Sequence, residues 1–336
     1  MPILSVGDRA STFQIRRQST GLKSDLTRLG QELATGVRAD LGAQVSGDFG
    51  PIAAIERSLS AIAAYRTSNA EAAGLLEATQ LALGAVQQLG RDLTPGVLTA
   101  ASSRDPAMIH ATGQDARQKF SASVAALNTR AADRSLLAGA ATDRPAMAPA
   151  GTIMAALVAA VAGETTAQGV TAAVDAWFDT PGGGFQTIAY LGAGTDMGPM
   201  TIADGESVDL TARADAPAVR AALKAQALAA LIAEGVLDTD RDQQAALIAT
   251  ASERMLAADG EITNLRAGLG AVEARIEDAK AQNAAEASAF ELARAGMIGA
   301  DPYHTASELE AVYSRIEMLY TVTARIAGLK FTDYMR

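Results

Sequence analysis

The placement of proline constrains this chain more than any other feature. The chain has ten prolines, yet none lies between Pro2 and Pro51 and none lies between Pro217 and Pro302. Proline breaks a helix interior because it lacks the backbone N–H and its ring clashes with the preceding turn. Two long stretches, one towards each end, are therefore free to form long helices, and turn-rich structure is confined to the middle.

An amphipathic pattern fills the first of these stretches. Its apolar residues recur three, four or seven positions apart, with charged residues mostly on other faces, which is typical of a helix with a coiled-coil seam. The seam residues are Ile15, Leu22, Leu26, Leu29 and Leu33. The glycine-rich segment 42–50 interrupts the pattern, and Pro51 suits the first position of a new helix.

Two further helices are predicted in the first half of the chain. One carries regularly spaced apolar residues over 52–89 and is expected to end near Pro95, because proline is disfavoured inside a helix. The other is expected to begin at the pair Asp105 and Pro106, since Asp is a favoured cap and proline suits the first turn. It is predicted to run towards Arg130.

The last third of the chain mirrors this arrangement. A first set of apolar residues alternates three and four apart at Ile262, Leu265, Leu269, Val272 and Ile276. The heptad then weakens at Asn283 and resumes in a new register, which places the second set at Leu309, Val312, Ile316, Leu319 and Ile326. Asp301 followed by Pro302 indicates the start of a separate last helix.

Between about residues 140 and 240 the sequence has shorter elements and more turn signals. Two alanine-rich runs, 154–161 and 219–232, are predicted to be helices. Three short strands separated by glycine-rich turns are predicted at 185–190, 200–202 and 208–210. This segment is therefore expected to form a small α+β insertion.

These patterns together predict a mainly α fold. The expected architecture is a long antiparallel helical bundle or coiled coil formed by both chain ends, with a small α+β insertion domain in the middle. Segments 1–50 and 300–336 are predicted to form a terminal coiled-coil domain. Segments 51–140 and 241–299 are predicted to be the two halves of a helical body, and 141–240 the insertion.

The composition argues against an enzyme. The chain has no cysteine and only two histidines, His110 and His304. The lack of cysteine excludes thiol chemistry and a metal site built on cysteine, and two histidines leave few candidates for a Ser-His-Asp triad. A net charge of −10 disfavours nucleic-acid binding, which needs a basic face. We expect no catalytic residue, no cofactor-binding residue and no metal site, and we expect neither a cleavable secretion signal nor a membrane anchor.

Four local motifs have weaker chemical interpretations. Segment 238–242 resembles the opening of a calcium loop, but helix capping explains it better. Segment 192–197 begins like a dinucleotide loop but has Met197 where the third glycine belongs. His304 is expected to be an ordinary exposed residue. Trp177 and Phe178 are expected to form an aromatic plug between a helix and the first strand rather than to line a ligand pocket.

Both chain ends carry motifs of a known family. The first helix contains LTRLGQELATG at 26–36, and IAAIE follows at 52–56. The centre contains LNTR at 127–130, LLAG at 136–139 and TDRP at 142–145, and the chain closes with DPY at 301–303 and ARIAGLKFTDY at 324–334. These segments resemble the flagellar hook-associated protein 3 family of hook–filament junction proteins, within the flagellin superfamily. Residues 37–50, Leu137 and Ala138 depart from the family pattern, and the resemblance covers about half of the chain.

The resemblance implies a structural protein of the bacterial flagellum that is exported without a cleaved signal. Its implied partners are a hook-associated protein, flagellin, further copies of itself in a ring, and an export chaperone, with neither nucleic acid nor membrane insertion involved. No cofactor is implied. The expected assembly interface comprises Ile15, Leu22, Leu26, Leu29, Leu33, Leu309, Val312, Ile316, Leu319, Ile326, Phe331 and Tyr334.

Alternative functions remain at this point. Flagellin, the filament subunit, shares the terminal helices, although the central motifs at 127–145, which resemble the hairpin of the family, and the FTDY ending at 331–334 favour the junction protein. A cytoplasmic coiled-coil protein that binds partners would explain the heptads but would not need the glycine-rich insertion. An enzyme lodged in the insertion would need a convergent set of polar residues, which the sequence does not show.

Overall fold

The computed structural model describes the backbone of residues 6–334 and the side chains of residues 10 and 12–325. The chain divides into two compact units. The first, called here the terminal unit, comprises Met1–Ile62 and Ala284–Arg336, and the second, the central unit, comprises Ala63–Asn283. Two long helices, α3 (Gly50–Ser103) and α8 (Arg241–Ile298), contribute to both units. The predicted division of the chain into the five segments 1–50, 51–140, 141–240, 241–299 and 300–336 stays a prediction.

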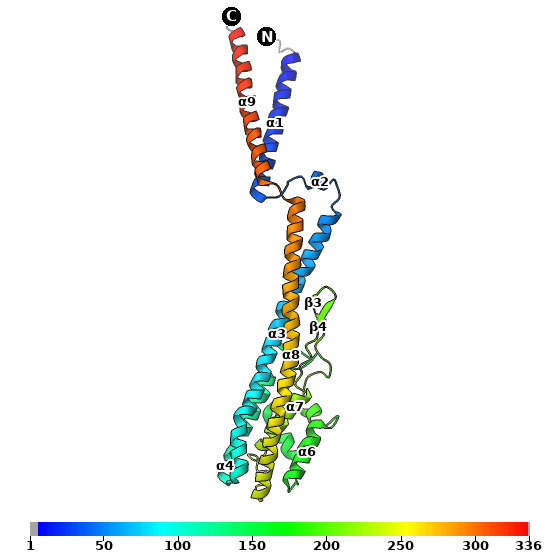
Figure 1. Cartoon of the computed structure of the whole chain (residues 1–336), viewed down its shortest axis with the longest axis vertical. Helices are drawn as coiled ribbons and strands as arrows, with labels where there is room; N and C mark the ends of the chain where they lie inside the picture. Colours follow the sequence, from blue (N-terminus) through cyan, green and yellow to red (C-terminus); the bar gives the residue numbers. More distant parts are fainter. Residues whose placement is uncertain (1–5, 335–336) are drawn as a thin grey trace. The chain divides into compact units, whose positions relative to one another are not determined.

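The terminal unit pairs the two ends of the chain. Helix α1 (Val6–Thr35) and helix α9 (Pro302–Tyr334) pack side by side and run in opposite directions (Figure 1). A short helix, α2 (Leu41–Gln44), follows α1. As predicted, α8 ends just before the Asp301–Pro302 pair, and Asp301 Oδ1 accepts hydrogen bonds from the backbone N–H of Tyr303 at 2.9 Å and of His304 at 3.2 Å.

The central unit holds a helical core and two small hairpins. Its shorter helices are α4 (Pro106–Leu127), α5 (Ala150–Ala160), α6 (Ala167–Asp179), the π-helical turn η1 (Phe185–Ala189) and α7 (Pro217–Ala230). The antiparallel hairpins are β1 (Arg130–Ala131) with β2 (Arg134–Ser135), and β3 (Met200–Ala203) with β4 (Glu206–Val208). The predicted fold class, mainly α with a small α+β insertion, is confirmed.

Helix α3 does not end near Pro95, which corrects the sequence-based boundary. It continues to Ser103 with Pro95 inside it. Proline in a helix interior costs about 3 kcal/mol, but here the ring lies on an exposed face while Leu93 and Val97 on either side are fully buried. Burial of that apolar face outweighs the missing hydrogen bond, so the helix continues for two more turns.

The weakened heptad at Asn283 is not a break in the helix. Helix α8 passes through this position without interruption. Asn283 Nδ2 donates to the carbonyl oxygen of Ile202 at 2.8 Å, and Asn69 Nδ2 from α3 donates to the same oxygen at 3.0 Å. The two buried asparagines therefore clamp strand β3 against α3 and α8, and this explains why polar residues replace apolar ones there.

The first predicted strand, 185–190, is wrong. Phe185–Ala189 forms a π-helical turn, and only Tyr190 makes an isolated bridge, to Met147. Gly184 permits this arrangement, because the Trp177 ring lies where a Cβ atom of any other residue would sit. The ring of Trp177 occupies the space beside Gly184, and the chain coils so that Phe185 is buried against Phe178, with ring centroids 5.4 Å apart.

The other insertion elements agree more closely with the sequence. The predicted strand at 200–202 lies within β3, and β4 covers the start of the predicted 208–210 strand, whose Leu210 is buried just beyond it. The alanine-rich runs form α5 and α7 as expected. The hairpin expected after α4 is present as β1 and β2.

Candidate assembly interface

The seam between α1 and α9 holds most of the residues that the sequence singled out. Leu29 and Val312 are buried, with exposed fractions of 1 % and 6 %. The half-buried members are Ile15, Leu22, Leu26, Leu309, Ile316 and Leu319. Leu33 is 41 % exposed, and Ile326, Phe331 and Tyr334 lie outside the described side chains. The structure therefore brings two apolar rows together, but one chain buries them only partly.

Apolar contact holds this pair together. Between residues 13–34 and 302–325 the structure shows no hydrogen bond or ion pair that joins α1 to α9. The charged side chains bond along their own helix, as Arg28 does with Asp25 and Glu32. The cross-helix attraction at Arg28 is the longer-range one to Glu308 of α9. Since apolar packing is non-directional, the seam residues themselves specify the register only weakly, and directional contacts between the segments that flank the two helices lie at the base of the pair.

A second feature of α9 is the apolar surface that the seam does not use. Its exposed large residues are Tyr303, Tyr313, Met318, Tyr320 and Val322. Tyr313 and Tyr320 are seven residues apart and share one flank of the helix, whereas Met318 and Val322 are four apart and share another. With α1 covering the seam, α9 thus presents apolar side chains on two further flanks.

A cluster of polar contacts, called here the polar knot, lies at the base of the α1–α9 pair, where α1 ends and α9 begins. Glu32 is buried, and its Oε1 accepts from Arg28 Nη1 at 3.1 Å and from the backbone N–H of Ala39 at 3.0 Å. The main chain crosses there, because the N–H of Arg38 donates to the carbonyl of Ile298 at 2.9 Å and the N–H of Ala300 donates to that of Gly36 at 2.9 Å. The hydrogen bond with Glu32 raises the pKa of Arg28.

Glu32 is a residue of this candidate site that the seam pattern did not single out. The available signal was a carboxylate three residues after Leu29, where the seam spacing would continue. A buried carboxylate is stable only when it is paired and hydrogen-bonded, and Glu32 has both kinds of partner. It fixes the turn by which the chain leaves α1.

The central unit joins its own long helices differently. Gln80 on α3 and Arg266 on α8 bond reciprocally, because Gln80 Nε2 donates to the Arg266 carbonyl at 3.0 Å and Arg266 Nε donates to Gln80 Oε1 at 3.0 Å. Arg266 Nη1 also donates to Gln87 Oε1 at 2.7 Å. These directional bonds fix which residues of α3 face which residues of α8.

This row of hydrogen bonds between α3 and α8, called here the ladder, continues one turn further along the two helices. Gln87 Nε2 donates to Thr263 Oγ1 at 2.8 Å, and Arg91 forms two bonds with Asp259, at 2.6 Å and 3.1 Å. The Arg91 hydrogen bond is the main cause that lowers the pKa of Asp259, so this carboxylate stays ionised. The ladder comprises Gln80, Gln87, Arg91, Asp259, Thr263 and Arg266.

The other candidate motifs have structural roles. Asp240 caps α8, since its Oδ1 accepts from the N–H groups of Asp242 at 3.0 Å and Gln243 at 3.1 Å. The loop at 192–197 packs on the hairpin region, where the N–H of Ala193 donates to the Ala138 carbonyl at 2.9 Å. The preference for capping over a calcium loop at this helix start is thereby supported.

The aromatic residues and His304 also lie where the simpler interpretation places them. Trp177 and Phe178 pack edge to face at 4.9 Å, and both lie near Phe185. They form a plug, although it adjoins a π-helical turn and not a strand. His304 is exposed at the start of α9, 3.7 Å from Glu308.

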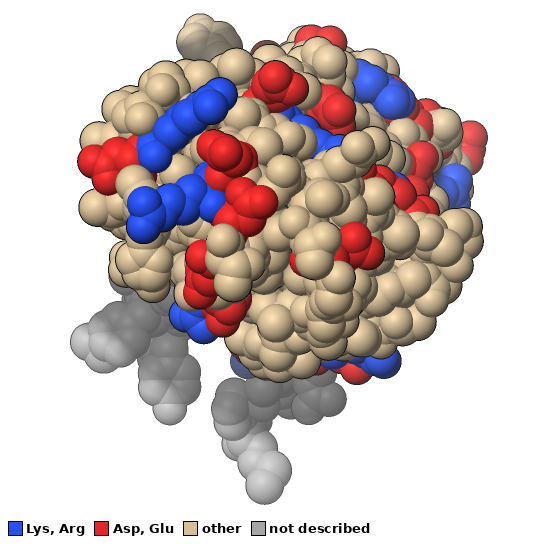
Figure 2. Space-filling model, turned by 90° about the horizontal axis from the view of Figure 1, so that it is seen from below, with Lys and Arg blue, Asp and Glu red and all other residues tan. Residues whose placement is uncertain are grey.

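Charges of both signs are interspersed on one face of the molecule. On the face drawn in Figure 2, acidic and basic side chains alternate among uncharged ones. Over the part of the chain that the structure describes, no three His, Cys, Asp or Glu side chains gather as metal ligands would. No described helix combines the length and the apolar character that a membrane span requires.

The fold defines a class of mainly α protein in which the first and last helices pair with each other, while a central unit carries a helical core with small hairpins. No family model and no curated protein matches the chain. Among solved structures it is similar to FlgL from Bacillus cereus, with a TM-score of 0.51 and 15 % identity over 70 % of this chain and 96 % of that chain.

A protein described as a flagellar hook-associated protein, from Vibrio parahaemolyticus, is a more distant neighbour. It matches with a TM-score of 0.40 and 15 % identity over 70 % of this chain and 93 % of that chain. At such low identity the likeness to FlgL establishes a shared fold, and the match to the Vibrio protein is too weak to add to it.

Proposed function

We propose that this chain is a structural protein of the bacterial flagellum that joins the hook to the filament. One observation carries the proposal: the α1–α9 seam is only partly buried in a single chain, and α9 keeps apolar side chains exposed on two further flanks. Burial of such surface drives association. The fold shared with FlgL of Bacillus cereus supports the flagellar setting.

Assembly would proceed through the terminal helices. In the proposed ring, the α1–α9 pair of one copy lies against those of its neighbours, which cover the flank of Tyr313 and Tyr320 on one side and the flank of Met318 and Val322 on the other. The seam residues, including Ile326, Phe331 and Tyr334, are proposed as the interface. Each copy would use one of these flanks to contact the copy before it and the other flank to contact the copy after it, and such a contact between two different faces can repeat around a ring or along an axis.

The remaining parts of the proposal follow from the same role. The partners are a hook-associated protein, flagellin and further copies of this chain, and an export chaperone would hold the terminal helices before assembly. The chain would be exported to the flagellum without a cleaved signal and would have no enzymatic activity or cofactor. The adaptor presents one face to the hook side and another to flagellin, so that growth by this chain alone stops after about one layer.

Immunogold labelling of flagella tests the proposal. A single cluster of label where hook meets filament is the expected result, and deletion of the gene should leave hooks intact while flagellin is lost to the medium. Label along the whole filament would instead identify the chain as flagellin. Label confined to the cytoplasm would favour a coiled-coil protein that binds partners there.

A further inference from the structure

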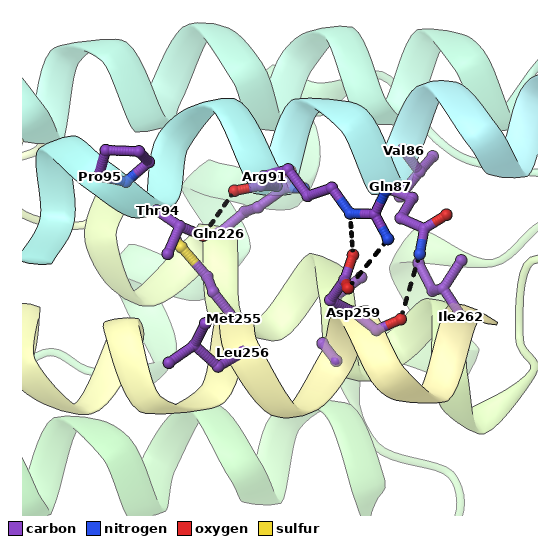
Figure 3. A pocket seen from close by; sticks show the side chains of 13 residues that line it. Val86, Gln87, Arg91, Thr94, Pro95, Gln226, Met255, Leu256, Asp259 and Ile262 are labelled. Atoms are coloured by element: carbon purple, nitrogen blue, oxygen red, sulfur yellow. Dashed lines mark hydrogen bonds and ion pairs between the residues drawn. The ribbon is translucent and has the colours of Figure 1, made fainter. Parts of the chain in front are cut away.

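A pocket lies in the central unit between α3, α7 and α8. Its volume is about 210 Å³, and most of its wall is apolar, with Val86, Ala222, Met255, Leu256 and Ile262 among the lining residues (Figure 3). A dry cavity of about 150 Å³ already accepts benzene. The space is therefore sufficient for a molecule built on one ring or one branched aliphatic group.

The charged residues of the pocket are already neutralised. Arg91 and Asp259 form a bidentate pair at one side of the pocket, and Gln87 Nε2 donates to the Asp259 carbonyl at 3.2 Å (Figure 3). Thr94 Oγ1 donates to the carbonyl of Gly90 at 2.9 Å. Because these groups satisfy one another, the pocket offers no net charge and favours a neutral ligand.

Gln226 is the exception among the polar residues of the pocket. It lies on α7 with 1 % of its surface exposed, and neither its amide nitrogen nor its amide oxygen has a hydrogen-bond partner. By contrast, the side-chain amides of Gln87 and Asn283 in the same unit donate to partners. Buried amides are almost always hydrogen-bonded, and an exception calls for an explanation.

The neighbour of this amide leaves room beside it. Gly90 lines the pocket, and a Cβ atom built there would lie 3.8 Å from Nε2 of Gln226. No side chain at Gly90 stands between the pocket and this amide, but the amide nitrogen and oxygen are both buried, so a ligand in the pocket reaches them only after the amide turns. The last torsion of a glutamine side chain is broad, so the amide plane can turn towards the cavity without entering a strained rotamer.

We propose that this pocket binds a small neutral carboxamide whose apolar part is about one ring in size. A primary carboxamide has one donor and one acceptor side by side, as the Gln226 amide has, so the two groups can form a pair of hydrogen bonds. The apolar part of the ligand occupies the space between Val86, Met255 and Ile262. The site is independent of the terminal helices and of the proposed role in the flagellum.

Benzamide and toluene provide the test on the full chain. They share one benzene ring, which carries a carboxamide in benzamide and a methyl group in toluene. Binding is followed by saturation-transfer NMR and by the ligand-dependent rise in melting temperature. The wild-type chain should bind one benzamide at least about ten-fold more tightly than toluene. Gln226→Leu should lose that preference and bind both weakly, while the control Gln88→Leu, on an exposed position of α3, should keep it.

A second variant guards against indirect effects. Ala222 lines the pocket on α7, and Ala222→Leu fills the cavity without removing the amide, so it should abolish the binding of both compounds. Benzamide binding that is unchanged in Gln226→Leu, or that survives in Ala222→Leu, would overturn the proposal. So would the failure of the wild-type chain to bind benzamide, the result expected if ordered water satisfies Gln226 instead.

Discussion

The α1–α9 pair of the terminal unit and the α3–α8 pair of the central unit are both built from segments at opposite ends of the sequence, yet different forces hold them. In the α3–α8 pair, the ladder around Gln80, Gln87 and Arg266 joins the helices by directional bonds above a deep apolar core. In the α1–α9 pair the seam itself is apolar and polar contacts lie at its base, and of the predicted seam residues whose side chains the structure describes only Leu29 and Val312 are buried.

This difference suggests a division of labour. Directional bonds specify one register and so define a permanent pairing, whereas a thin apolar seam can accept a new neighbour without leaving buried polar groups unpaired. The central unit is thus suited to fold once and stay folded. The terminal helices are suited to complete their packing against other subunits.

Truncation of one leucine in each pair should give the largest contrast. Leu83 on α3 is fully buried, whereas Leu22 on α1 is half-buried. Leu83→Ala should lower the free energy of unfolding of the free chain by about 2–5 kcal/mol, as for other core leucines. Leu22→Ala should lower it by less than about 1 kcal/mol. Denaturant titration of both variants measures the difference, and equal losses would contradict the comparison.

Removal of the ladder should have a smaller effect. Arg266→Met leaves the Gln80 and Gln87 amide oxygens without their donor, which should cost about 1–3 kcal/mol of unfolding free energy. The control is Arg315→Met on an exposed position of α9, which should change stability by no more than about 0.5 kcal/mol. Thermal unfolding of the two variants measures the difference. Similar melting curves for Arg266→Met and Arg315→Met would show that the ladder does not stabilise the chain.

Acid should weaken the central unit through its paired carboxylates. Burial tends to raise the pKa of Asp175, but hydrogen bonds from Arg254 and Lys224 lower it below its ordinary value of 3.8. A lowered folded pKa means that the stabilisation is fully present above the unfolded pKa and is lost as pH falls through the folded one. Stability should therefore be constant from pH 7 to about 5 and decline below pH 4.

The control for this pH effect removes the charge. Asp175→Asn should be less stable than the wild-type chain at pH 7, by about 1 kcal/mol because the site is partly exposed. Its stability should also fall less steeply below pH 4 than that of the wild-type chain. Parallel pH profiles for the two chains would show that the ion pairs of Asp175 contribute nothing.

The smallest effect on the free chain is expected at Ile316. This residue is half-buried in the seam, and Ile316→Asp should leave the melting temperature of the monomer unchanged, because the melting transition reports the central unit. Attachment of filaments should nevertheless fail, since assembly would bury the new charge without a partner. The control Ser314→Asp, at an exposed position, should keep both. Cells that still build filaments with Ile316→Asp would contradict the account.

The sequence predicted the features that depend on local pattern. Heptad spacing picked out apolar rows that include the buried Leu29 and Val312, and the Asp–Pro pair located the start of α9. Prediction from the sequence failed where contacts between distant segments determine the local structure. Pro95 stays helical because its neighbours are buried, and the coil at Phe185 buries this ring against Phe178 from the preceding helix.

The polar residues of the interior show the same limit. Asn283 was visible as a weak point of the heptad, but its partner Ile202 is 81 residues away. Neither the buried knot at Glu32 nor the unpartnered amide of Gln226 has a local signature beyond a polar residue in an apolar row. Their roles depend on which segments meet there, and periodicity does not contain that information.

Amide hydrogen exchange on the free chain tests the central claim most directly. If the terminal pair is completed only by neighbours, roughly the first 40 and last 35 residues should exchange near the unprotected rate, because an isolated, thinly buried pair of helices is marginal. The segments 52–127 and 262–276 should exchange slowly. Equal protection of the terminal helices and of these segments would contradict the account.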